Sequence, residues 1–174
     1  MIEAIRETLG PWYVYIKFVH VLAVMIWGWS TMVGFGWYLR PMYIKWLRNP
    51  GDEVARERRN WAMEHFDRGV VPEHVAFPIV IVTGLLMFMV GDWHLGMNWL
   101  TFKLALVFGI FVPMEAVDYY LSHFGGNKEK IKKTGDMERY EKMIRVHWKF
   151  FIVTTPLVAI FIPTIIFLAI VKPF

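Results

Sequence analysis

Four stretches of apolar residues, each long enough to cross a lipid bilayer, limit this chain to very few folds. They cover residues 12–39, 72–93, 100–121 and 150–171. At a rise of about 1.5 Å per residue, a helix of about 20 apolar residues spans a hydrocarbon core of about 30 Å. Lipid offers the backbone no hydrogen-bond partner, so stretches of this length span it as helices. The expected fold is therefore all-α, an integral membrane four-helix bundle that forms a single domain.

The composition supports a membrane location. Hydrophobic residues make up 56% of the chain, above the range of about 45–50% that is typical of soluble domains. The first apolar stretch has no small-residue cleavage site after it, so we expect a retained helix and not a signal peptide. The chain has no cysteine, which excludes disulfides, thiolate metal sites, iron–sulfur clusters and haem attached through cysteine.

Basic residues gather in two of the three connections between the apolar stretches. They are dense in residues 40–68 and 128–149, and sparse in the remaining connection and at both ends of the chain. An excess of lysine and arginine marks the cytoplasmic side of a membrane protein. We therefore expect both long connections to be cytoplasmic and both termini to be non-cytoplasmic. The net charge of +4 then has a topological cause, and no nucleic-acid partner is expected.

Both long connections carry helix signals of their own. Asp52 precedes the mixed-charge residues 53–69, for which we expect a short helix lying at the membrane interface. Residues 124–135 are rich in glycine and lysine, and we expect a flexible turn there. Asp136 is placed to cap a helix that runs directly into the fourth apolar stretch.

Two ionisable residues lie within the apolar stretches at similar depth. The helical rise puts His20 about 8 Å and Lys103 about 10 Å from the expected midplane, on the same non-cytoplasmic side. The two side chains can therefore face each other across the bundle. A lysine at the centre of a span costs about 2.5–3.5 kcal/mol on insertion scales, which makes such residues functional candidates. Structural roles stay open, because His20 can bond a neighbouring helix and Lys103 can extend to the interface.

A second ionisable group is expected near the cytoplasmic ends of the spans. It consists of Glu73, His74, Glu115, Asp118, His123 and His147. Glu115 lies deepest and needs a proton or a partner, and His74 is the nearest partner by depth. Glu115 and Asp118, three residues apart, share a helix face. A proton relay, a second haem, a solvated helix-end cluster and a second metal site all remain open. The metal site would comprise His74, Glu115, Asp118 and His147.

Several motifs resemble those of a known family. The first span contains "YIKFVH", with Trp27 seven residues after His20, and the second contains "FPIVIVTG". The third span is entered through "WLTFKLAL", and the sequence ends in "AIVKPF". Together these motifs resemble the HemJ-type protoporphyrinogen IX oxidases. The resemblance implies a small protein of the cell inner membrane that binds haem b. It also implies that His20 ligates the haem iron, that Trp27 belongs to the cofactor site and that Lys103 is required for function.

The activity implied by this resemblance is oxidation of a tetrapyrrole such as protoporphyrinogen IX, with electrons passed to a quinone or another acceptor. Lys103 is the expected catalytic residue, because an ammonium at the bilayer edge can pair with carboxylates of the substrate or the haem. The expected partners are the lipid bilayer and a tetrapyrrole or quinone. A redox partner protein and a second copy of the chain are further candidates.

Two other functions remain open at this point. One is a cytochrome b-type electron-transfer subunit of a larger respiratory complex, in which His74 and His147 serve a second haem. Four-helix bundles build cofactor sites from facing helices, so the architecture permits this function. The other is a metal transporter that uses His74, Glu115 and Asp118 and binds no haem.

Overall fold

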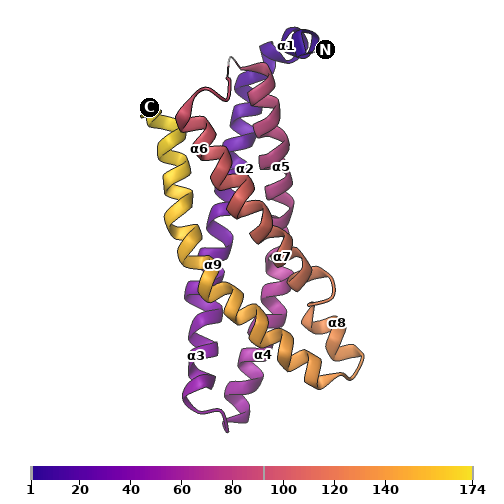
Figure 1. The fold of residues 1–174 in the computed structure, drawn as a ribbon. Helices are drawn as coiled ribbons and strands as arrows, with labels where there is room; N and C mark the ends of the chain where they lie inside the picture. Colours follow the sequence, from indigo (N-terminus) through magenta and orange to yellow (C-terminus); the bar gives the residue numbers. More distant parts are fainter. Residues whose placement is uncertain (1, 92, 174) are drawn as a thin grey trace.

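The computed structural model describes residues 2–91 and 93–173, and nearly all of them are helical (Figure 1). Within these residues, four helices are long and apolar enough to cross a membrane, and no strand occurs. The four run over Glu3–Arg48, Glu53–Val90, Asn98–Lys133 and Met137–Val171. The all-α fold of four membrane-spanning helices predicted from the sequence is therefore confirmed.

The first long helix is assembled from five consecutive segments without a loop between them. They are α1 (Ile2–Leu9), the 3₁₀ turn η1 (Gly10–Trp12), α2 (Tyr13–Val33), the π-helical turn η2 (Gly34–Leu39) and α3 (Arg40–Arg48). The helix therefore continues well past residue 39, where the apolar stretch ends.

A second π-helical turn, η3 (Val107–Phe111), interrupts the third span. Both π turns end two residues before a proline, Pro41 in one case and Pro113 in the other. Proline has no N–H, and its ring clashes with the carbonyl four residues earlier in an α-helix. A π turn widens the helix at that point, and the Val112 N–H accordingly bonds the carbonyl of Val107, five residues back. The two prolines therefore account for the two wide turns.

The other helices complete the bundle. They are α4 (Glu53–Gly69), α5 (Val71–Val90), α6 (Asn98–Leu106), α7 (Val112–His123), α8 (Lys128–Lys133) and α9 (Met137–Val171). The side chain of Asp136 accepts a hydrogen bond from the Arg139 N–H and caps α9. That helix then runs through the fourth span without a break, as the sequence predicts.

Two expectations for the connections need correction. Only Val70 separates α4 from α5, so residues 53–69 extend the second span instead of forming a separate interfacial helix. The segment 124–135, expected to be a flexible turn, contains the short helix α8. Asn127 caps α8 by accepting a hydrogen bond from the Lys130 N–H. A local cap and the packing of α8 against α4 and α9 thus order this segment.

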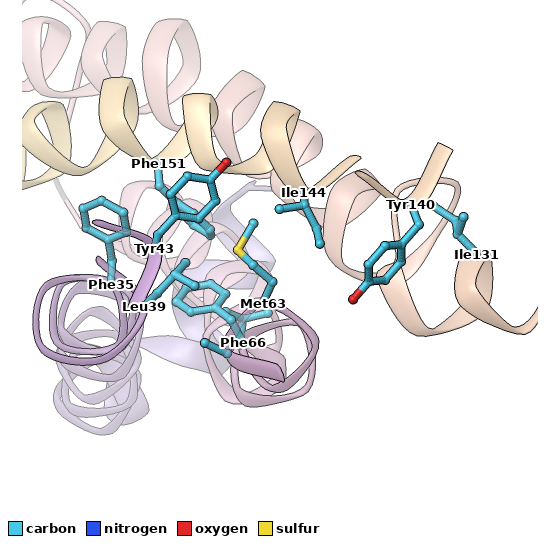
Figure 2. Close-up of a cluster of buried hydrophobic side chains, with 11 residues drawn as sticks. Phe35, Leu39, Tyr43, Met63, Phe66, Ile131, Tyr140, Ile144 and Phe151 are labelled. Carbon is cyan, nitrogen blue, oxygen red and sulfur yellow. The ribbon is translucent and has the colours of Figure 1, made fainter. Parts of the chain in front are cut away.

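The two ends of the chain lie at the same end of the bundle (Figure 1). The opposite end is built by α3, α4, α8 and the first half of α9, and we call it the loop end. Its core is a cluster of buried side chains, shown in Figure 2. Tyr43 of this cluster stacks on Trp148, with ring centroids 3.9 Å apart. Because the core continues into the loop end, the helices there pack as in a soluble domain.

The outer faces of the spans are apolar and exposed. Trp37 is 85% exposed and Ile170 is 74% exposed. A helix that is apolar on all sides is typical of a membrane span, where lipid covers the outer face. The fold thus fits a multi-pass membrane protein whose polar side chains are held inside the bundle.

Candidate functional site

His20 lies on α2 and is joined to α5 by a hydrogen bond. Its Nδ1 is 2.9 Å from Oγ1 of Thr83, and that hydroxyl donates to the carbonyl oxygen of Ile79 at 2.5 Å. A threonine hydroxyl has a single hydrogen, so an oxygen that donates to Ile79 must accept from His20. The Nδ1 of His20 therefore carries the proton, and Nε2 keeps its lone pair. We call His20, Thr83 and Lys103 the His20 site.

The backbone of α5 leaves room for the imidazole ring. A Cβ atom at Gly84 would lie 3.3 Å from Cε1 of His20. The hydrogen bond to Thr83 and the close contact with Gly84 together fix the position of the ring against α5.

Lys103 lies on α6 and is half-buried. It is close enough to His20 for the two side chains to interact electrostatically, which agrees with their expected similar depth. Within the described part of the chain, its ammonium has no hydrogen bond or ion pair. A half-buried cation of this kind is available to a carboxylate of a bound ligand.

Trp27 lies about two helical turns from His20, in the centre of the bundle. Its indole N–H donates to Oε1 of Glu115 at 2.6 Å. Its ring packs on Phe77 and Phe111, with centroids 5.2 Å and 4.9 Å away. The indole N–H of Trp27 therefore binds Glu115. The expected contact of Trp27 with a cofactor stays a prediction.

Asp118 is the centre of a buried polar network at the loop end. Its Oδ1 accepts from Nε2 of His147 at 3.0 Å and from the hydroxyl of Ser122 at 3.1 Å. Its Oδ2 lies 3.4 Å from Nε2 of His74. All four of these residues are buried. We call this group, with the residues that extend it below, the Asp118 network.

One branch of the Asp118 network reaches the surface. Nδ1 of His74 lies 2.6 Å from Nε2 of His123, which is only partly buried. The hydroxyl of Tyr119 donates to the backbone carbonyl of His74, and the two rings stack with centroids 4.2 Å apart. His74 is thereby held between Asp118 and the surface histidine.

The other branch ends in a buried ion pair. Nζ of Lys128 is 2.6 Å from Oδ1 of Asp67, contacts Nδ1 of His147 and donates to the carbonyl of Leu121 at 3.2 Å. The lysine is fully buried and Asp67 is 2% exposed. A buried charge is tolerated only when it is paired and hydrogen-bonded, and this lysine meets both conditions.

The structure corrects the expected partner of Glu115. The depth of the residues in the membrane predicted His74 as the partner of Glu115. In the structure, Glu115 is hydrogen-bonded to Trp27, and His74 lies beside Asp118. Residues three apart on a helix differ by about 60° around its axis, so Glu115 and Asp118 meet different neighbours. The helical rise gives height within the membrane but does not give this angle.

The four residues predicted as a second metal site are accordingly split. Glu115 is hydrogen-bonded to Trp27. His147 lies beside Oδ1 of Asp118, and His74 lies beside Oδ2. Among the described residues, no group of three or more histidines and acidic residues is arranged to hold a metal ion. Both ring nitrogens of His147 have protein partners.

Sequence reasoning missed Asp67 and Lys128. Asp67 lies seven residues before His74, which is about two helical turns and places both on one face of a continuous helix. That signal was available once α4 and α5 are taken as one helix. No sequence signal separates Lys128 from the other lysines of its connection.

Comparison with known protein families, with curated proteins and with solved structures gives no match to this chain.

Proposed function

We propose that this chain is a haem b-binding membrane oxidoreductase that oxidises a tetrapyrrole such as protoporphyrinogen IX. The observation that carries the proposal is the hydrogen-bond chain from His20 through Thr83 to Ile79. Histidines that ligate metals almost always donate their other ring N–H to a fixed acceptor, which orients the ring. The His20 side chain has this arrangement, with the Nε2 lone pair left for iron.

The donor chemistry of the His20 site fits haem b. A neutral imidazole is a common axial ligand of haem iron, and the absence of cysteine fits a haem that is not covalently attached. Lys103 supplies a cation for the propionates of the haem or the carboxylates of a tetrapyrrole substrate. When bound, haem b supplies one-electron transfer between the substrate and an acceptor such as a quinone.

The protein's own part in this activity is binding and orientation. His20 would hold the haem iron, Thr83 would keep His20 in the required tautomer, and Lys103 would neutralise carboxylates close to it. The exposed apolar faces of the spans lie in lipid, the phase from which a quinone or an apolar macrocycle would approach. The basic connections at the loop end favour a cytoplasmic position for that end, and thus a location in the inner membrane.

The positions of the histidines favour one bound haem per chain over two. A second haem would require His74 or His147 as a ligand. Both ring nitrogens of His147 have hydrogen-bond partners. Nε2 of His74 has none within the described part of the chain, but it faces Oδ2 of Asp118 at 3.4 Å. A redox partner protein would then accept the electrons. A second copy of the chain would be a neighbour in an oligomer.

An activity assay with a matched lysine control tests this function. Purified, haem-loaded protein is mixed with protoporphyrinogen IX and a soluble quinone, and the fluorescence of the oxidised porphyrin is followed. Lys103→Ala should keep its haem and lose most of the activity, whereas Lys17→Ala, which alters an exposed lysine of α2, should match the unaltered protein. Haem-loaded protein that oxidises no porphyrinogen would contradict the proposed substrate.

A further inference from the structure

A small cavity lies inside the bundle next to Glu115. It is bordered by Trp27 of α2, Glu73 of α5, Glu115 and Asp118 of α7, and Thr154 of α9. Its size is that of about one water molecule. The cavity therefore connects Glu115 with Asp118, although the two carboxyl groups have different protein partners.

Glu115 has one oxygen without a partner. The residue is 4% exposed, and its Oε1 accepts from Trp27. Its Oε2 is buried and has no hydrogen-bond partner within the described part of the chain. A buried polar atom of this kind is costly unless a water molecule, a proton or a ligand satisfies it.

Among the described residues that line the cavity beside Glu115, none is a lysine, an arginine or a histidine. α2 presents the neutral Trp27, α5 presents Glu73, α7 presents Asp118, and α9 presents the hydroxyl of Thr154. Glu73 and Asp118 both interact electrostatically with Glu115. One neutral N–H beside two carboxyl groups stabilises a buried negative charge poorly, and binding of a proton removes that charge.

A route for protons leads from the surface to this cavity. It passes from the partly buried His123 to His74 through a hydrogen bond of 2.6 Å. It then crosses a gap of 3.4 Å from Nε2 of His74, which has no hydrogen bond within the described part of the chain, to Oδ2 of Asp118. Asp118 borders the cavity, and a single water there can bridge it to Glu115. The branch through His147 and Lys128 ends in the buried pair with Asp67, and it holds Asp118 in place.

We propose that Glu115 is a proton-binding site inside the bundle, and that it exchanges its proton with the loop-end surface through Asp118, His74 and His123. Each step moves a proton from an N–H or O–H donor to the lone pair of the next acceptor. The donor regains a proton from its outer neighbour, and His123 regains one from solvent water. No electron is transferred, and the net change is a proton taken from water and bound to Glu115. The site is separate from the His20 site and does not depend on bound haem.

Infrared spectroscopy on the full chain in lipid vesicles tests the proton-binding site. The carbonyl stretch of a protonated carboxylic acid is recorded at neutral pH while the buffer is exchanged from H₂O to D₂O. The account predicts a band that shifts on deuteration and that Glu115→Gln removes. Glu53→Gln, which alters an exposed carboxylate paired with Arg56, should leave the band unchanged. A spectrum without this band, or a band that survives Glu115→Gln, would overturn the proposal.

The route is tested by the rate at which the same band shifts. Asp118→Asn and His123→Gln should keep the band but slow its deuteration by about tenfold or more, which corresponds to a barrier higher by about 1.4 kcal/mol. His65→Gln, at a partly exposed histidine that bonds the Trp61 carbonyl of its own helix, should have no effect. His123 is partly exposed, so its variant decides the question if Asp118→Asn fails to fold. Unchanged rates in the folded variants would refute the route.

Discussion

His20 and Thr83 connect the first and second spans through a hydrogen bond of 2.9 Å, in which the threonine oxygen accepts. The direction of this bond follows from the second bond of Thr83, to the carbonyl of Ile79. It assigns the proton of the imidazole to Nδ1. The structure thereby presents Nε2 as the candidate ligand atom.

Removing the threonine hydroxyl is expected to weaken haem binding without unfolding the protein. Thr83→Val keeps the shape of the side chain but leaves Nδ1 of His20 without its acceptor. Loss of such an orienting partner commonly lowers metal affinity by about 10- to 100-fold. Haem titration followed by absorbance measures the effect. Thr83→Ser, which retains a hydroxyl, should bind nearly as tightly as the original protein, and equal affinities for all three proteins would contradict the assigned role.

Breaking the buried ion pair at the loop end is expected to destabilise the protein strongly. Lys128→Ala leaves Asp67 as an unpaired charge that is 2% exposed, and such a change costs about 3–5 kcal/mol. Arg68→Ala serves as the control, because Arg68 is 56% exposed and Glu129 is 36% exposed in their ion pair, and exposed pairs contribute at most about 1 kcal/mol. Denaturant unfolding in detergent compares the two variants. Similar midpoints would show that the buried pair does not support the fold.

A methyl group at Gly126 is expected to disturb the start of α8. A Cβ there would lie 2.7 Å from Cα of Leu121, so the backbone has to move. Overpacking of this kind costs about 1–3 kcal/mol. Gly109→Ala is the matched control, because a Cβ at that position meets nothing within 4 Å. Thermal unfolding should give a lower midpoint for Gly126→Ala only, and two equal midpoints would contradict the close packing.

The spans could be predicted from the sequence because the membrane imposes a length on any apolar helix. Caps could be predicted as well, since Asp136 acts on N–H groups within its own first turn. The continuity of α4 with α5 was not predictable in this way. The mixed charges of residues 53–69 are typical of an interfacial helix, but the side chains buried at the loop end instead pack α4 against η2 and α7.

The sequence predicted the depth of the site residues in the membrane, but not the side of the helix on which each of them lies. The rise per residue placed His20 and Lys103 at one level, and the structure brings them within electrostatic reach. The same reasoning chose the wrong partner for Glu115, because rotation about a helix axis is not fixed when most faces of the helix are apolar. Lys128 was missed for a related reason. Its burial depends on α8 packing against α4, a contact between segments about 60 residues apart.

The proposed role of His20 as the ligand of a single haem b is tested by the haem content of the purified protein. Reduced and oxidised absorption spectra of the detergent-purified protein give the haem bound per chain, for the original protein, His20→Ala and His74→Ala. We expect one haem b per chain in the original protein and in His74→Ala, and none in His20→Ala. Haem retained in His20→Ala, or no haem in the original protein, would show that His20 is not the ligand of a haem b. Two haems, each lost with one of the two histidines, would instead establish the electron-transfer cytochrome.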